Sequence, residues 1–168
     1  MTQTELFLAE LDRESDRSRR MLDLVPEGKY DWKPHERSMA FGYLAELVAT
    51  MPSWVAMTVN QDELDLQPPG GQAPARNRMN TSSEFLEALD KAVADARAAL
   101  QKTSDDYLLM PWRLLVGGKV VMESPRHEVI RETFNHLAHH RGQMTVYFRL
   151  MGVKVPALYG PSADDQRF

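Results

Sequence analysis

The chain has 168 residues, of which 43% are hydrophobic and 26% are charged, and its formal net charge is -4. This length and composition are typical of one globular domain, so we expect a single domain over residues 1–168. The negative charge disfavours nucleic-acid binding, which needs a basic surface. Because the chain contains no cysteine, disulfides, thiolate metal ligands and a cysteine nucleophile are excluded.

No segment has the pattern of a membrane anchor. The first 20 residues carry charges of both signs and lack an apolar signal core. The longest uncharged run, residues 47–61, contains Pro52 and is too short for a transmembrane helix. We therefore expect a cytoplasmic protein that does not associate with membranes.

The first predicted helix begins at a capping-box sequence, Thr2 to Glu5, and ends at Pro26. Apolar residues recur along it at the spacing of a helical bundle, with Ser15 and Ser18 among them. These serines could leave room for a ligand or water. Alternatively, they could allow close helix packing with locally bonded hydroxyl groups, which is the interpretation that we favour.

A connector and a kinked second helix are expected next. His35 lies in the connector, residues 30–35, and we interpret it as a surface or loop-fixing residue. Ser38 is the expected N-cap of the second helix. Pro52 lies inside the apolar pattern of this helix, so it should kink the helix or end its first half, with Trp54 packed at the kink.

Residues 66–80 contain three prolines and two glycines and predict the one long loop of the chain. This loop could be a lid over a site, but a simple connection is the safer interpretation. A second capping box, Thr81 to Glu84, begins the third predicted helix, which ends at residues 103–106.

Two short apolar runs on either side of Gly117 and Gly118 predict a small β-hairpin within residues 114–122. The last and longest helix should follow, with Ser124 and Pro125 as its N-cap and first residue. It should run to residue 151, before a glycine suited to end it. The predicted fold class is therefore all-α, a four-helix bundle with a short β-hairpin before the last helix.

Three of the five histidines lie within residues 135–143 of the last predicted helix. His136 and His140 are four residues apart, so a helix places them on one face, about 6 Å apart. Apolar residues share this face, so both histidines should point inward. Such a pair is either part of a site for a divalent metal ion or a buried polar patch satisfied by its neighbours.

The residues around this pair have several expected roles. His139 could face a neighbouring helix or a dimer partner, but a half-buried, hydrogen-bonded histidine is the preferred interpretation. His127 should be structural or on the surface. Arg141 and Gln143 should fix the last helix through hydrogen bonds, and Gly142 should permit close helix contact.

The His-His-Arg-Gly-Gln segment at residues 139–143, followed by Tyr-Gly-Pro at 159–161, resembles the last helix and tail of the DinB/YfiT-like family. The Asp-Trp-Lys-Pro-His segment at 31–35 and the Pro-Ser-Trp segment at 52–54 extend the resemblance over nearly the whole chain. The resemblance implies a four-helix bundle, usually a homodimer. It also implies that a divalent metal such as zinc or nickel often binds to three histidines, one from the second helix and two from the last.

The two histidines of the last helix in that site correspond to His136 and His140, whereas the histidine of the second helix falls on Leu47, which cannot bind a metal. Glu46 should face elsewhere, because a shift of one residue rotates a helical side chain by about 100°. Glu132 lies two turns, roughly 11 Å, from His140, too far for easy three-point chelation.

Two functions are therefore expected. The first is a metal-dependent enzyme, transferase-like or hydrolase-like, in which His136 and His140 hold Zn²⁺ or Ni²⁺ with positions open to water. The resemblance implies this class, some of whose members use a small thiol cofactor. The second is a metal-free relative, a dimer that binds a small ligand or has a structural role, which Leu47 favours. No residue can be assigned as catalytic from the sequence.

Overall fold

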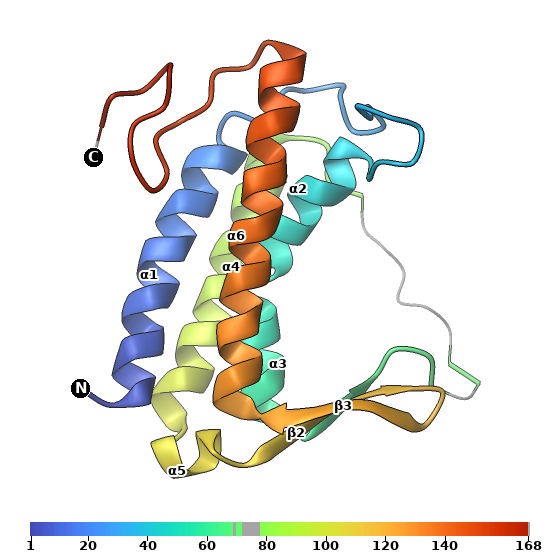
Figure 1. Ribbon diagram of the computed structural model, residues 1–168, viewed down its shortest axis with the longest axis vertical. Helices are drawn as coiled ribbons and strands as arrows, with labels where there is room; N and C mark the ends of the chain where they lie inside the picture. The colour runs from blue at the N-terminus through green and yellow to red at the C-terminus, as the bar shows by residue number, and fades with distance from the viewer. Residues whose placement is uncertain (69, 72–77, 168) are drawn as a thin grey trace.

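The structure, a computed structural model, describes residues 1–68, 70–71 and 78–167. Within these residues the chain is mostly helical, with a small three-stranded sheet at one end (Figure 1). The helices are α1 (Gln3–Leu22), α2 (Phe41–Thr50), α3 (Ser53–Asn60), α4 (Ser82–Lys102), α5 (Asp105–Leu108) and α6 (Arg126–Met151). The strands are β1 (Glu63–Asp65), β2 (Pro111–Val116) and β3 (Lys119–Pro125).

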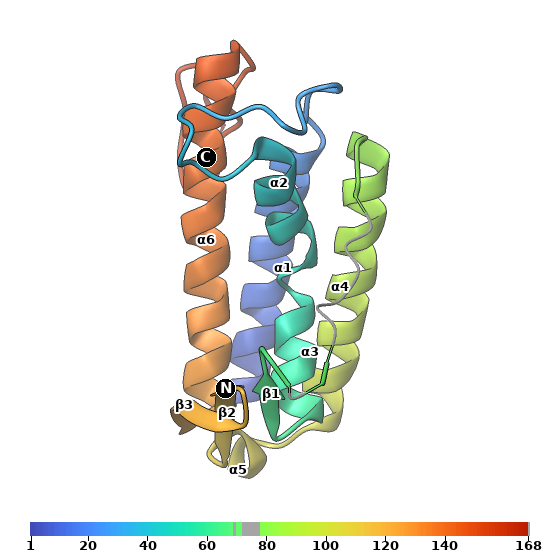
Figure 2. The ribbon, with the colours of Figure 1, turned by 90° about the vertical axis from the view of Figure 1, so that its right-hand side faces the viewer.

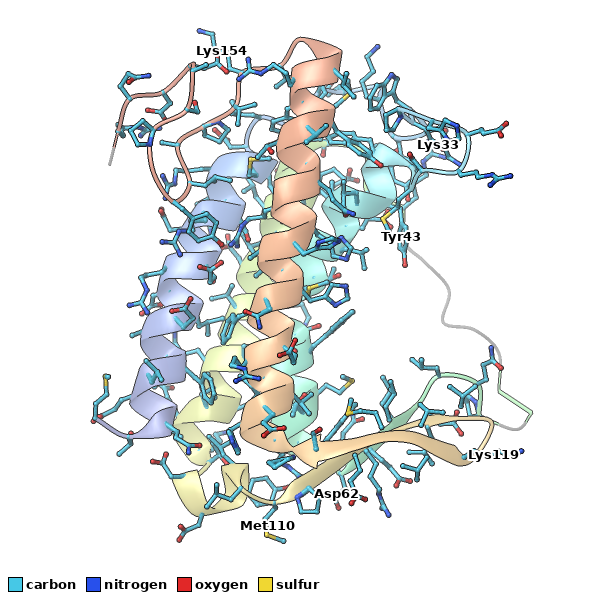
Figure 3. The ribbon with its side chains drawn as sticks, in the orientation of Figure 1. Lys33, Tyr43, Asp62, Met110, Lys119 and Lys154 are labelled. Atoms are coloured by element: carbon cyan, nitrogen blue, oxygen red, sulfur yellow. The ribbon has the colours of Figure 1, made fainter. Side chains whose placement is uncertain are left out.

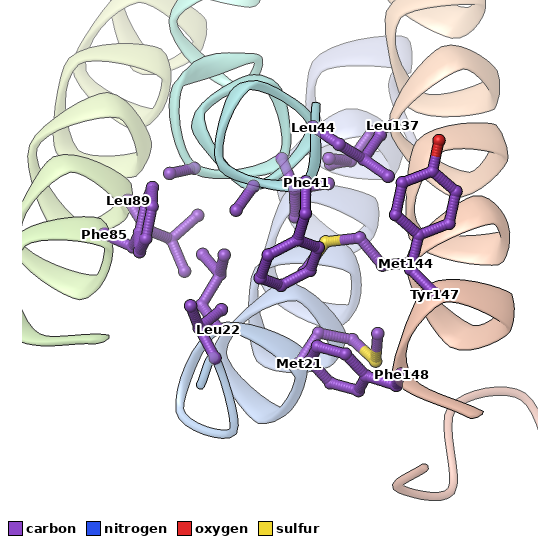
Figure 4. Packing of buried hydrophobic residues seen from close by; sticks show 14 of the residues in the cluster. Met21, Leu22, Phe41, Leu44, Phe85, Leu89, Leu137, Met144, Tyr147 and Phe148 are labelled. Carbon is purple, nitrogen blue, oxygen red and sulfur yellow. The ribbon is translucent and has the colours of Figure 1, made fainter. Parts of the chain in front are cut away.

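The long helices lie side by side along the long axis of the molecule (Figures 1 and 2). Helix α4 packs on α1, α2 and α3, and α6 packs on α1, α2 and α3. Buried aliphatic, aromatic and methionine side chains from α1, α2, α4 and α6 fill the space between them (Figure 4). None of the described helices combines the length and apolar character needed to span a membrane.

The predicted starts of two helices are confirmed. At α1 the Thr2 hydroxyl accepts a hydrogen bond from the Glu5 N–H while the Glu5 carboxylate accepts from the Thr2 N–H. Thr81 and Glu84 form the same capping box at α4. The predicted N-cap of α2 is wrong, because Ser38 lies in a turn and Ala40 precedes the helix without a side-chain cap.

The predicted break at Pro52 is confirmed. Helix α2 ends at Thr50 and α3 begins at Ser53, because proline has no N–H to continue the helical hydrogen bonds. Trp54 follows directly and packs against the hydrophobic core. The break therefore places an indole ring beside α6, where the candidate site lies.

The predicted hairpin is confirmed but is longer than expected, and β2 and β3 pair antiparallel around Gly117 and Gly118. Both glycines have positive φ values, 60° and 76°, which this turn requires. Strand β1, not predicted, pairs parallel with β2. Because β3 extends to Pro125, Ser124 pairs with Trp112 and cannot cap α6 as predicted.

Two further predictions concern the ends of elements. The C-terminus of α6 is confirmed, since Gly152 adopts a left-handed conformation with a φ of 73°. The short helix α5 follows α4, where the sequence indicated only a helix end. Of the predicted loop at 66–80, residues 69 and 72–77 lie outside the described residues.

Candidate functional site

Helix α6 brings three histidines together. The ring centroids of His136 and His140 are 4.5 Å apart, those of His139 and His140 are 5.3 Å apart, and those of His136 and His139 are 6.4 Å apart. The predicted pair therefore lies on one face of the helix, and His139 joins it. Figure 3 draws the side chains of α6 together with those of the neighbouring helices and the sheet.

The expectation that both histidines of the pair point inward is only half correct. His140 is buried, with 5% of its surface exposed, whereas His136 is exposed. His136 lies one turn closer to the sheet, where α6 borders an open pocket. His139 is exposed as well, so the preferred interpretation of it as half-buried is wrong.

Gln143 fixes the orientation of the buried histidine. The Nδ1 atom of His140 lies 2.8 Å from Oε1 of Gln143, so Nδ1 donates a proton to this amide oxygen. Burial lowers the pKa of His140; the Gln143 hydrogen bond opposes this, while the nearby His136 and His139 add to it. His140 is therefore neutral at pH 7 and keeps a lone pair on Nε2.

Helix α3 contributes an aromatic neighbour to the cluster. The indole of Trp54 packs edge-on against the imidazole of His136, with 5.6 Å between the ring centroids. This T-shaped arrangement is one that aromatic pairs prefer. Trp54 occupies this position because the chain breaks at Pro52 and restarts as α3.

An apolar pocket extends from His136 toward the sheet; we call it the helix–sheet pocket. Its volume is about 410 Å³. The lining residues come from α3, β1, β2, β3 and α6, together with the residue after β1: Trp54, Met57, Thr58, Leu64, Leu66, Trp112, Leu114, Met122, Val129, Glu132, Thr133 and His136. Apart from Thr58 on α3, the polar residues of this lining lie on α6, along one border of the pocket.

The three-histidine metal site that the resemblance implies does not fit these residues. Leu47 is partly buried and packs against the hydrophobic core. The Glu46 carboxylate accepts hydrogen bonds from the Tyr30 hydroxyl (2.6 Å) and the Met79 N–H (3.2 Å), so it is engaged away from the histidines. Within the described ranges, no group of three His, Cys, Asp or Glu residues could hold a metal ion.

The predicted structural role of Arg141 is confirmed. Its guanidinium is fully buried, and Nη1 donates to the Glu14 carbonyl (2.9 Å) and the Ser18 hydroxyl (3.0 Å). Nη2 forms an ion pair with the Glu14 carboxylate, which also accepts from the Tyr159 hydroxyl (3.1 Å). This network joins α1, α6 and the tail and lies outside the histidine cluster.

The two serines of α1 differ from each other. Ser15 donates to the Leu11 carbonyl at 2.5 Å, the local bond that we favoured. The Ser18 hydroxyl instead accepts from Arg141, which local spacing does not reveal. The prediction for Gly142 is wrong, because this glycine is exposed and a Cβ there would meet nothing within 4 Å.

The remaining histidines are structural, as expected. His127 Nδ1 lies 3.1 Å from the Leu108 carbonyl, and exposed His35 accepts from the Arg37 N–H in the connector. Arg126 was not predicted to be buried, yet its buried guanidinium donates to Tyr107 (2.9 Å) and pairs with Asp62. Arginine in the first turn of a helix gave no signal of burial.

Comparisons with known proteins agree with this architecture. A crystal structure of a DinB-like protein from Bacillus cereus ATCC 10987 covers 95% of this chain and 100% of its own, with a TM-score of 0.72 and 23% identity. The crystal structure of a DinB-like protein, YjoA, from Bacillus subtilis covers 96% of this chain and 99% of the YjoA chain, with a TM-score of 0.67 and 16% identity. Both likenesses concern the fold.

Sequence comparisons extend over the same length. The uncharacterized protein YrdA of Bacillus subtilis (strain 168) is 24% identical over 161 residues, which are 95% of this chain and 89% of YrdA. A sequence model described as the DinB family matches residues 1–167. With the helical fold and the His-His-Arg-Gly-Gln segment of α6 already described, this match shows that the chain belongs to the DinB family.

Proposed function

We propose that this protein binds a small, largely apolar molecule in the helix–sheet pocket, with the polar group of the molecule directed toward His136. The observation that carries this proposal is the pocket of about 410 Å³, which mostly apolar residues line, with the polar ones on α6 and at Thr58 of α3. A concave apolar surface with a few polar groups at its border is the usual form of a small-molecule site. Leaving such a surface in water is costly, so a ligand that covers it gains binding free energy.

The histidine at the border of the pocket is His136, and His140 lies behind it on the same helix. The neutral His140 presents a lone pair on Nε2, and Gln143 holds the ring orientation that leaves this atom free. His136 separates His140 from the pocket and contacts Trp54. A hydroxyl or amide group on the ligand would find hydrogen-bond partners here without a metal ion.

The test is calorimetric titration with 2-cyclohexylethanol, an apolar ring that carries one hydroxyl. We expect one binding site on the wild-type chain and loss of binding in Val129→Glu, which places a charge in the pocket. The matched control is Val121→Glu on β3, where the side chain is 58% exposed and outside the pocket. Absence of binding, or equal binding by Val129→Glu, would reject the proposal.

The proximity of His136 and His140 favours a second candidate function. Their ring centroids are 4.5 Å apart, and Gln143 orients the buried ring as residues that support metal ligands do. In this candidate the two histidines hold a divalent ion such as Zn²⁺ or Ni²⁺, and the protein is a metal-dependent enzyme. Two protein ligands hold such an ion more weakly than three, so the metal-free function ranks first.

Titration of chelator-treated protein with Zn²⁺ and with Ni²⁺ separates the two candidates. The metal-dependent candidate requires about one ion per chain at micromolar affinity or better, lost in His136→Ala and kept in His35→Ala. His35 is a suitable control because it lies in the connector, apart from the cluster. No binding by the wild-type chain would reject this candidate and leave ligand binding in the pocket untouched.

The assembly is also a proposal. The packing of α1, α2–α3, α4 and α6 supports a four-helix bundle, and the resemblance implies a homodimer. Val146 and Leu150 lie one turn apart on α6 and are 57% and 60% exposed, which supports a second copy covering this face. Sedimentation equilibrium should give twice the chain mass, and the double variant Val146→Glu/Leu150→Glu should give the chain mass.

A further inference from the structure

The walls of the helix–sheet pocket contain several rings and thioethers, and we infer that its ligand carries an aromatic ring. This inference rests on the proposed function and specifies the class of molecule. Three of the lining side chains are aromatic, Trp54, Trp112 and His136, and two are methionines, Met57 and Met122. A pocket that served only to bury aliphatic groups would not need these residue types.

On the α3–α6 side of the pocket, two rings already have a geometry that aromatic pairs prefer. Trp54 meets His136 edge-on with 5.6 Å between their centroids, so the pair presents both a ring face and a ring edge. A third ring can extend such a pair by stacking on a face or approaching an edge. A saturated ring of the same size gains only the burial of its surface.

The sheet supplies a wall suited to a flat group. Leu64, Leu114 and Met122 are register partners across β1, β2 and β3, so their side chains form one row on one face. Trp112, two residues before Leu114 on β2, lies on the same face and is 2% exposed. A planar ring can lie along this row while its edge faces the helices.

The methionine sulfurs add to the preference for an aromatic ligand. Met122 comes from the sheet wall and Met57 comes from α3, so thioethers are present on both sides of the pocket. Sulfur contacts the edge of an aromatic ring favourably and gains less from an aliphatic one. The two walls therefore favour the same class of molecule independently.

The decisive test compares two alcohols that differ only in the ring, 2-phenylethanol and 2-cyclohexylethanol, by calorimetry on the full chain. Burial alone favours the saturated ring, which is the more hydrophobic of the two. The inference requires the reverse order, with 2-phenylethanol binding about fivefold more tightly. Equal or tighter binding of 2-cyclohexylethanol overturns the aromatic inference and leaves the proposed function standing; absence of binding by both overturns both.

Variants locate the preference in the walls. The preference is measured as the dissociation constant of 2-cyclohexylethanol divided by that of 2-phenylethanol. Trp54→Leu should reduce this ratio to about one, and Met122→Leu should reduce it partly while keeping the wall filled. Trp32→Leu is the matched control, because Trp32 packs on Tyr147 at 5.5 Å and does not line the pocket. An unchanged ratio in both pocket variants would overturn the assignment of the preference to these residues.

Discussion

At the scale of single residues, two glycines inside helices have opposite surroundings. A Cβ on Gly42 in α2 would lie 2.0 Å from the ring of Tyr30, whereas a Cβ on Gly142 in α6 would meet nothing within 4 Å. The sequence indicated close packing at Gly142 and gave no signal at Gly42. Only the fold distinguishes them, because the neighbour of Gly42 comes from the connector before its helix.

These glycines give a matched pair of substitutions. Gly42→Ala should lower the free energy of unfolding by about 1–3 kcal/mol, because the added methyl group displaces a packed ring. Gly142→Ala should raise it by about 0.5–1 kcal/mol, because alanine costs less backbone entropy within a helix. Urea denaturation of both variants measures these changes, and a loss of stability in Gly142→Ala would contradict the open surroundings described for it.

Arg141 is the residue whose removal should cost most. Arg141→Met should lower the free energy of unfolding by about 3–5 kcal/mol, because the buried Glu14 carboxylate loses its closest cation. Arg141→Lys should recover little of this, since an ammonium group cannot reproduce the contacts to Glu14 and Ser18.

A double-mutant cycle separates the pair from each residue alone. Adding Glu14→Gln to Arg141→Met should restore part of the lost stability, because it removes a buried charge that then has only Arg17 as a partner. Strictly additive effects in chemical denaturation would show that the two side chains do not interact.

At the scale of elements, the Asp65 side chain holds β1 against the β2–β3 hairpin in the sheet that forms one wall of the pocket. Its carboxylate accepts hydrogen bonds from the backbone N–H groups of Gln67 (2.9 Å), Gly117 (3.0 Å) and Gly118 (2.7 Å). The Gln67 hydrogen bond is the largest cause that lowers the pKa of Asp65; burial opposes it, and the bonds from Gly118 and Gly117 keep the pKa below its ordinary value. One side chain thus connects β1 to the tip of the hairpin.

Asp65→Ala should therefore loosen the sheet while leaving the helices intact. We expect faster amide hydrogen exchange in β2 and β3, unchanged exchange in α4, and weaker binding of 2-cyclohexylethanol. The control is Glu63→Ala on the same strand, whose carboxylate makes an exposed ion pair with Arg113. Equal exchange in the two variants would show that the carboxylate of Asp65 does not hold the hairpin.

The elements that the sequence predicted well are those determined by local pattern. Capping boxes, helical spacing, the break at Pro52 and the left-handed glycine at 152 are all encoded within a few neighbouring residues. Strand β1 could not be predicted in this way, because three residues carry no periodicity and their pairing with β2 joins distant segments.

At the scale of the whole molecule, the parts of the candidate site that the sequence predicted are again those determined by local spacing. His136 and His140 were found because both lie on one helix, where spacing fixes their proximity. Trp54 and strand β1 were not found as parts of the site, because five elements must pack before they share a pocket. The exposure of His136 depends on that packing as well, so periodicity alone placed it wrongly inside.

The same nonlocal packing makes one carboxylate responsible for holding three distant segments together. Glu14 on α1 contacts Arg141 on α6 and Tyr159 in the tail. Burial raises the pKa of Glu14, but Arg141, and to a smaller extent Arg17 and the Tyr159 hydroxyl, outweigh burial and hold it below the ordinary value of 4.5. The folded chain therefore holds this carboxylate ionised at a pH where the unfolded chain is already protonated.

Stability should consequently depend on pH in a defined direction. The contribution of Glu14 is complete above about pH 4.5 and is lost as pH falls toward its lower folded pKa, because the unfolded state then binds the additional proton. Glu14→Gln should thus be less stable than wild type at pH 7, and the difference should shrink in acid. Glu10→Gln is the control, since Glu10 pairs with Arg13 near the surface. Parallel curves of unfolding free energy against pH for Glu14→Gln and wild type would contradict the role assigned to this carboxylate.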